Sequence, residues 1–457
     1  MPETSWDEHE LVFKFDTDGP PRFDVYVMDV SYFSGKLECY LRYKRIPHRR
    51  IEVTWEQMAK NSKYTGLMQV PVVFDRELNI WLRDTTSIIV LFESAPDLYG
   101  IQPNRPIIPS QACDSFLSFL LEEFADEWLW LPALYYRWDF RLDAGNLSRR
   151  FMIHDFYRDS TPLNLPEWLA QMVIIDRQHD EYVYQGGVQD EAGRLYVQGI
   201  YLSTLMALEA HFTQHPFLLG DHPTLVDFGF AASMFRHFSL DPTPSKIMRL
   251  RAPHTYEWVA RMWNSGSLKS SIQSGSSPFA EFSSTIQPLL SQALNSFVPY
   301  MVSNAKALLG QQESFQVGPL KMKPVAFRAW SASKLGARWL ALSTEDQILI
   351  DNYLHAQGLS LCHFKNAIPS IMKAGSLWGE STEPPHCSHT GEPSLLTKVL
   401  GTPNHAILRK VPHPTSFMLS LVATFVLFSF WSWKNKKQAI KIVAIVYFLT
   451  KVRSKYI

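Results

Sequence analysis

Two short motifs hold residue types that could bind a small polar ligand. Asp84 and Thr85 stand where a helix is expected to begin. A helix N-terminus offers free N–H groups and a positive dipole end, which suit a carboxylate. Plain N-capping would explain the same two residues. Val70-Pro71 precedes a short apolar strand, where a cis bond would hold a tight turn. A trans proline opening an edge strand is the simpler interpretation of that dipeptide alone.

The elements around these motifs follow a strand-rich pattern. A β-rich run, an amphipathic helix and a second strand make a β-α-β unit, which implies a parallel pair of strands. A hairpin-sized link then joins two more short strands, and a helix follows at once. The economical arrangement is a mixed four-stranded sheet, with strands at 23–28, 50–53, 71–74 and 79–82 and helices at 35–45 and from residue 84.

The strand pattern stops near Ser110, and long amphipathic segments follow as far as Trp263, which indicates an all-helical block. Residues 1–22 have the composition of a polar leader. We predict an α/β domain at residues 22–100 and an all-α domain at residues 110–265. Extra helices at 282–365, a disordered linker at 366–415 and a candidate transmembrane helix at 416–433 complete the prediction.

Four local features resemble the glutathione transferase superfamily over about residues 22–265. The loop SYFSGK is similar to the S-P-F-x-x-K stretch of serine-type members, and Val70-Pro71 is placed like the family's Val-Pro. DTTSI is similar to Glu/Asp-Ser-x-x-Ile, and PFLLG followed by TLVD is similar to P-x-L-x-G and T-x-x-D. The resemblance implies a thioredoxin-like α/β domain followed by an all-α domain, a cis Val–Pro bond, and glutathione as co-substrate.

The resemblance also implies a role for each matched residue of the first domain. The backbone of Val70, oriented by Pro71, would pair with the cysteinyl part of glutathione like an added strand. Thr85 would bind the γ-glutamyl carboxylate, and Asp84 would face the γ-glutamyl ammonium. Ser31 would donate its hydroxyl to the sulfur and favour the thiolate, which is the nucleophile. A small electrophile would be attacked in a cleft between the two domains.

Ser31 is the predicted catalytic residue, although a loop or helix-capping serine would look the same. Tyr32 and Ser34 are rivals for the thiol contact, because the alignment of this loop can slip by a residue or more. The loop contains no cysteine, which argues against the cysteine-type branch of the superfamily. Cys39, on the following helix, fits a packed side chain better than a nucleophile.

The helical block offers fewer candidates. Thr224 and Asp227 form a capping-box-like pair, to which the resemblance assigns a structural role. An aromatic stretch at 128–138 follows four acidic residues. By resemblance its members Tyr135, Arg137 and Trp138 are candidates for the second-substrate pocket. Core packing, or a subunit contact in a homodimer, explains them more simply.

The amino-acid composition limits which partners and which cellular compartment are expected. The 457 residues include 44 basic and 44 acidic side chains, but the last 65 residues hold ten basic and no acidic ones. The rest of the chain is therefore acidic, which argues against a nucleic-acid partner. Four scattered cysteines and a charged N-terminus favour a reducing, cytoplasmic compartment. The His/Cys clusters at 362–363 and 386–389 lack zinc-site spacing, so no metal is expected.

The tail supports a second interpretation of the chain. Residues 416–433 carry no charge and are near the lower length limit of a transmembrane helix. Trp431 and Trp433 lie at the end of this run and lysines follow it, like an interfacial flank, which predicts a membrane anchor. A buried helix, or an extension foreign to the module, fits the tail as well. The run SYFSGKLECYLR also resembles the metaxin and failed-axon-connections relatives, which implies a non-catalytic adaptor or membrane-associated protein.

Overall fold

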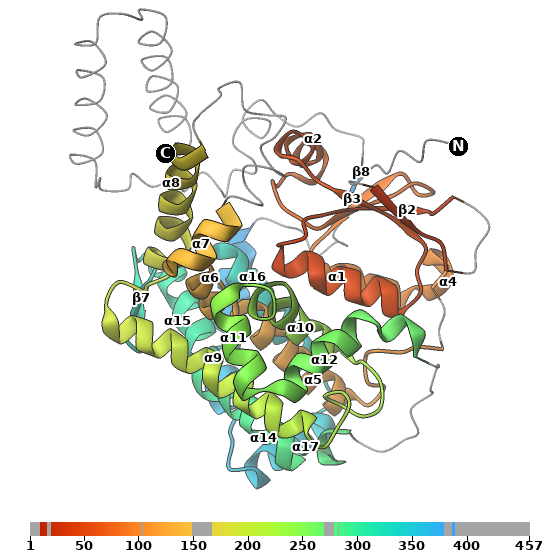
Figure 1. Cartoon of the computed structure of the whole chain (residues 1–457). Helices are drawn as coiled ribbons and strands as arrows, with labels where there is room; N and C mark the ends of the chain where they lie inside the picture. Colours follow the sequence, from red (N-terminus) through yellow and green to blue (C-terminus); the bar gives the residue numbers. More distant parts are fainter. Residues whose placement is uncertain are drawn as a thin grey trace, which may run out of the picture.

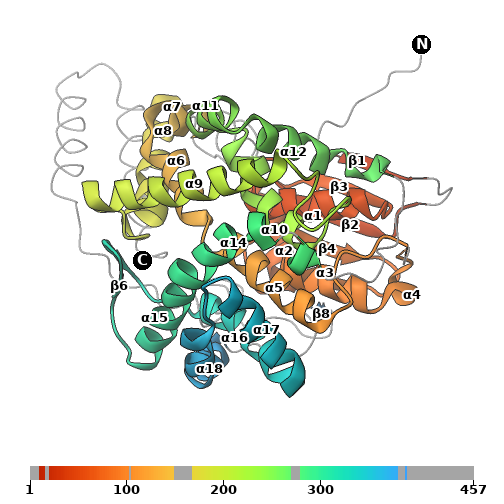
Figure 2. The same cartoon turned by 90° about the horizontal axis from the view of Figure 1, so that it is seen from below.

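A mixed sheet lies at one side of the molecule, and helices fill the rest (Figures 1 and 2). The computed structural model describes residues 10–15, 20–101, 104–148, 167–268, 278–281, 283–378 and 386–388. The sheet order is β1-β3-β2-β4-β5-β8. In that order the strands are Glu10–Phe13, His48–Glu52, Phe23–Val27, Val72–Asp75, Ile80–Arg83 and His386–Ser388.

The four central strands agree with the prediction, and the two outer strands do not. β2 and β3 run parallel, whereas β4 is antiparallel to both β2 and β5. β1 comes from the predicted polar leader and pairs antiparallel with β3, and β8 pairs antiparallel with β5. The sheet therefore has six strands rather than four. β1 was missed because its apolar run is short and because Leu11 and Val12 remain exposed at the sheet edge.

Helices cover both faces of the sheet (Figure 1). α1 (Tyr32–Tyr43) lies between the sheet and the helical block. α3 (Thr85–Ser94) packs against α1. α2 (Trp55–Thr65) lies on the other face and was not predicted. Its buried positions include Asn61 and Thr65 beside Met58. The helical period is therefore weak when only apolar residues are counted. A short helix, α4 (Pro96–Tyr99), closes the domain.

The helical block is built around α10 (Leu225–Ser233), all of whose residues are buried. α10 packs against α1 of the first domain and against α5. The capping box predicted from Thr224 and Asp227 is present at its start. The other helices are α5 (Ala112–Glu127), α6 (Trp130–Asp139), α7 (Arg141–Leu147), α8 (Glu167–Gln178), α9 (Glu191–Phe212), α11 (Pro242–Arg251) and α12 (Pro253–Trp263), with π-helical turns η2 (His179–Tyr184) and η3 (Met234–Phe238).

The extra C-terminal helices pack beside α5, as Figure 2 shows. They are α13 (Pro278–Glu281), α14 (Ser283–Gln292), α15 (Val298–Leu309), α16 (Ala326–Ala341), α17 (Thr344–Ala356) and α18 (Cys362–Gly375), with a π-helical turn η5 (Ala293–Phe297) and a hairpin of β6 (Phe315–Val317) and β7 (Leu320–Met322). Ser343 caps α17 and so separates it from α16.

The beginning of the predicted disordered linker is helical instead. α18 extends beyond residue 365 because Phe364, Ile368 and Ile371 form a buried stripe, and α18 packs against α15 and α16. Pro369 lies within this helix. Among the helices that the structure describes, none is long and apolar enough to cross a membrane. The predicted span at 416–433 lies outside the described residues.

Candidate functional site

The predicted site residues gather at one end of the sheet, where β2 and β5 end and β4 begins. The strand register places Tyr26 opposite Val72 and Val72 opposite Arg83. If the same alignment is continued beyond the strands, Val70 lies beside the loop that follows β2 on one side and beside Thr85 on the other. The sheet topology thus brings together the three motifs that were matched separately in the sequence.

Ser31 is the N-cap of α1. Its backbone is extended, with φ −81° and ψ 129°, and its hydroxyl oxygen accepts a hydrogen bond from the Ser34 N–H at 3.3 Å. The side chain is half-buried. Among the described residues, none accepts a hydrogen bond from the Ser31 hydroxyl. Because a hydroxyl can accept and donate at once, Ser31 can cap the helix and still offer its proton to a ligand.

The two rival hydroxyls of the loop are buried and already engaged. Ser34 is fully buried and accepts a hydrogen bond from the Met28 N–H at 3.2 Å. The Tyr32 hydroxyl donates to the carbonyl oxygen of Ala125 on α5. Burial, and after it the charge of Asp126, raises the pKa of Tyr32 well above its ordinary value. Of the three residues, Ser31 is therefore the one that is only half-buried, and no described residue engages its hydroxyl proton.

The Val70–Pro71 peptide bond is cis, as the resemblance implied. Val70 is half-buried and precedes β4 by two residues. Within the described part of the chain, no group bonds the N–H or the C=O of Val70. These two backbone groups lie at the end of a sheet, so an extended ligand segment could pair with them.

Asp84 and Thr85 form the start of α3. Asp84 is the N-cap, and its carboxylate accepts a hydrogen bond from the Ser87 N–H at 2.9 Å. Its φ of 67° is uncommon for a residue with a side chain, and such backbones often occur at functional sites. Thr85 occupies the first helical position and is buried. The first-turn N–H groups of Thr85 and Thr86 have no acceptor within the helix, as is usual for a helix N-terminus, and such groups can bind an anion.

A lysine that the sequence analysis did not single out completes this part of the site. Lys334, on α16, places its ammonium nitrogen 3.1 Å from the Asp84 carboxylate and 2.8 Å from the Ser87 hydroxyl. The same nitrogen lies 3.4 Å from the centre of the Trp330 ring. Burial alone would raise the pKa of Asp84, but Lys334 and the hydrogen bonds from Ser87 outweigh it and lower the pKa.

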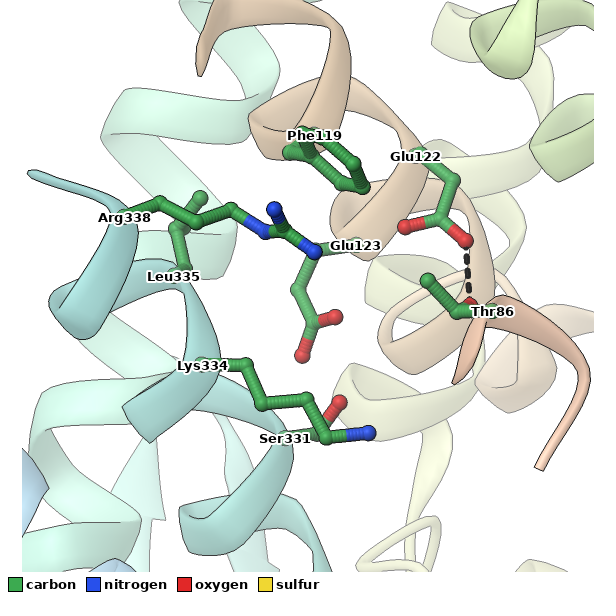
Figure 3. A pocket seen from close by; sticks show the side chains of 8 residues that line it. All are labelled: Thr86, Phe119, Glu122, Glu123, Ser331, Lys334, Leu335 and Arg338. Atoms are coloured by element: carbon green, nitrogen blue, oxygen red, sulfur yellow. Dashed lines mark hydrogen bonds between the residues drawn. The ribbon is translucent and has the colours of Figure 1, made fainter. Parts of the chain in front are cut away.

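Figure 3 shows how α16 faces the acidic side of α5 next to this pair. Lys334 and Arg338 extend from α16 towards Glu123, and the Arg338 guanidinium stacks 3.4 Å from the centre of the Phe119 ring. Burial, and then Glu127 and Glu122, raises the pKa of Glu123 to about 8. The gap between these side chains is about 10 Å³, roughly the room of one water molecule. It is too small for a ligand.

A buried ionic cluster lies behind α3 and joins the two domains. Lys36 on α1 is fully buried and pairs with Glu122 and with Asp126 at 2.5 Å, both on α5. The Thr86 hydroxyl, 2.9 Å from the Lys36 ammonium, donates to Glu122 at 2.5 Å (Figure 3). Burial alone would lower the pKa of Lys36, but the two carboxylates raise it instead. The lysine of the loop motif is therefore structural.

The three aromatic-stretch candidates serve the interior. Tyr135, Arg137 and Trp138 are all buried. Arg137 binds Asp241 at 2.8 Å and donates to the carbonyl oxygen of Val30 at 2.7 Å, so it ties the loop before Ser31 to the helical block. Cys39 is also fully buried, and burial raises the pKa of its thiol to about 12, which suits packing rather than nucleophilic chemistry.

Residues 172–265 match the family described as the glutathione S-transferase C-terminal domain. The matched segment includes helices α9 to α12 and the capping box that begins α10. This part of the chain is therefore similar to the helical domain of the glutathione transferase superfamily. No curated protein matches its sequence.

Several solved structures are similar to part of the chain. The β-etherase LigF from Sphingobium sp. strain SYK-6 is 14% identical, with a TM-score of 0.36, over 53% of this chain and 94% of its own. The glutathione transferase URE2P6 from Phanerochaete chrysosporium, solved with oxidized glutathione, is 14% identical, with a TM-score of 0.32, over 54% of this chain and 97% of its own. A glutathione S-transferase from Sinorhizobium meliloti 1021 is 16% identical, with a TM-score of 0.33, over 54% of this chain and 89% of its own.

Proposed function

We propose that the chain binds glutathione at the end of the sheet and conjugates its thiolate to a small electrophile. The single observation that carries this proposal is the backbone of Val70, whose N–H and C=O have no partner among the described residues. The cysteinyl residue of glutathione would pair with these groups as an added strand. The γ-glutamyl carboxylate would lie on the first-turn N–H groups of α3, with Thr85 beside it.

In this proposal Ser31 favours the thiolate. Its free hydroxyl proton would donate to the sulfur, and the N-terminus of α1 would add a positive dipole end. The thiol proton leaves to solvent, the sulfur attacks an electrophilic carbon, and the leaving group departs with its electron pair. Tyr32 and Ser34 would hold the loop, since their hydroxyls are buried and engaged.

The first test is binding. Purified full-length protein is passed over immobilised glutathione, and its affinity for free glutathione is measured by calorimetry. Turnover is then followed with 1-chloro-2,4-dinitrobenzene, a generic aryl halide. A folded protein that neither binds glutathione nor turns over the halide contradicts the proposal. It would favour the non-catalytic adaptor, in which Lys334 permanently satisfies Asp84.

The second test assigns the activator. In Ser31→Ala we expect the pKa of bound glutathione to rise by about one to two units, because a hydrogen bond to a charged group contributes about 1.5–3 kcal/mol. The ultraviolet absorbance of the thiolate across a pH series measures it.

Thr54→Ala is the matched control for the second test. Thr54 caps α2 with the same 3.3 Å bond that Ser31 makes at α1. It should lose helix stability without moving the thiol pKa. An unchanged thiol pKa in Ser31→Ala, together with a loss of turnover in Tyr32→Phe, would assign the role to Tyr32 instead.

A further inference from the structure

We propose that Lys334 is a built-in competitor for the ammonium end of the ligand, through which the extra C-terminal helices regulate binding at the site. The inference rests on the proposed function. It concerns one contact, that of the Lys334 ammonium with the Asp84 carboxylate at 3.1 Å. A γ-glutamyl ammonium that faced Asp84 would need the same position, so the two cations exclude each other.

The lysine matches the chemistry of the group it replaces. Its nitrogen is a primary ammonium with three donors, like the α-ammonium of a γ-glutamyl residue. Two donors reach Asp84 and the Ser87 hydroxyl, and the third side of the nitrogen faces the Trp330 ring. While this arrangement holds, the negative charge of Asp84 is neutralised and attracts a second cation only weakly.

The competing side chain is free to leave, because other residues hold α16 in place. Arg328 donates to the Tyr300 hydroxyl at 2.6 Å and stacks 3.7 Å from the centre of the Trp130 ring. Arg338 stacks on Phe119. The Lys334 side chain remains 29% exposed and that of Asp84 18% exposed, so the pair meets solvent. Lys334 can therefore turn away from Asp84 while α16 stays docked.

The charges predict a preference among ligands. A ligand with a carboxylate and no ammonium can use the N–H groups at the start of α3 without displacing Lys334, and the lysine adds a favourable positive charge. Glutathione must displace the lysine to place its own ammonium on Asp84. Glutathione without its amino group, a glutaryl-cysteinyl-glycine, therefore separates the two cases, since it keeps every other group.

The experiment measures the affinity of full-length protein for both peptides by calorimetry. Lys334→Met keeps the length and packing of the side chain but removes the charge. We expect glutathione to bind on the order of 10-fold more tightly to this variant, because a charged hydrogen bond no longer has to be displaced. The deaminated peptide should bind equally well or more weakly. Lys334→Arg retains the cation and should behave like the unaltered protein.

Lys373→Met is the matched control. Lys373 is exposed on α18, so this substitution makes the same chemical change at a position away from the site. Thermal melts establish that each variant folds. Equal affinities of the unaltered protein and Lys334→Met for glutathione would overturn the proposal, as would an equal gain for both peptides. Failure of all variants to bind either peptide would instead remove the proposed function, and the regulation with it.

Discussion

Single residues at this site serve folding and the proposed chemistry together. Asp84 accepts the Ser87 N–H as a helix cap and also holds a cation, and Ser31 caps α1 while keeping a hydroxyl proton. Local sequence could identify both residues because a cap is a local pattern. Lys334 could not be found this way, since it lies 250 positions from Asp84 and no short-range rule links them.

Glu123 gives a pH-dependence prediction at the same scale. Its pKa is raised to about 8 by burial and then by Glu127 and Glu122, against about 4.3 in an unfolded chain. The folded state therefore holds the proton more strongly, so stability falls as pH rises from about 4 to about 8. We expect Glu123→Gln to flatten this slope and to melt above the unaltered protein at pH 9.

Melting temperatures across pH 5–9 check the expectation for Glu123. Glu257→Gln, at an exposed position of α12, is the control and should keep the original slope. If Glu123→Gln and Glu257→Gln give the same profile, the Glu123 carboxyl does not titrate in this range and the account of its burial is wrong.

At the scale of elements, α10 depends on Asp227, the third helical residue, which completes its capping box. Asp227 is fully buried and accepts hydrogen bonds from the Leu218 N–H at 3.0 Å, the Thr224 N–H at 2.9 Å and the Trp258 indole N–H at 3.1 Å. Asp227→Ala removes the Asp227 half of the capping box, whereas the N-cap residue Thr224 stays, and it leaves buried donors without a partner. The free energy of unfolding should drop by about 2–5 kcal/mol, as measured by chemical denaturation.

Asp190→Ala separates loss of a cap from loss of the buried network. Asp190 caps α9 through the Gly193 N–H at 2.8 Å, and its side chain is exposed. This variant should cost about 1 kcal/mol. Similar losses in Asp190→Ala and Asp227→Ala would show that the Leu218 and Trp258 contacts contribute little.

Element prediction succeeded where the apolar period was clear and failed where polar residues supplied the buried positions. The central strands and α1 and α3 follow their apolar patterns closely. α2 escaped prediction because Asn61 and Thr65 share its buried face with Met58. α18 was mistaken for part of a disordered linker because Pro369 and the polar composition of the segment after it obscured a short apolar stripe.

At the scale of the whole molecule, Lys36 joins the sheet domain to the helical block. Lys36→Met would leave Glu122 and Asp126 buried without their cation. Breaking a buried ion pair by removing one partner costs about 3–5 kcal/mol. We expect that loss in chemical denaturation at neutral pH. The loss should shrink at acidic pH, where Asp126, whose pKa is raised by burial well above its ordinary value, takes up a proton.

Lys60→Met is the surface control for Lys36. Lys60 pairs with Glu56 on α2, and both side chains are more than half exposed. Its removal should change stability by no more than about 1 kcal/mol. A comparably small effect of Lys36→Met would contradict the account of this cluster as a buried ion pair that stabilises the fold.

The acidic run on α5 shows what the sequence could not reveal at this scale. Glu122, Glu123, Asp126 and Glu127 look like a solvated helix face, yet all four are buried. Their cationic partners, Lys36 and Arg328, come from α1 and from α16, two segments about 300 residues apart. A charged helix becomes an interior element only when both neighbours are folded, and that is a property of the assembled chain.

The position of α16 matters to anyone who trims this protein to its two-domain part. A fragment that ends before α16 would lose Arg328, Lys334 and Arg338 together and would bare Glu123, Glu127 and Asp84 to water. Its isoelectric point would fall, and any cation that reached Asp84 would meet a carboxylate without its lysine partner. Binding constants measured on such a fragment would describe a more acidic and less selective molecule than the full chain.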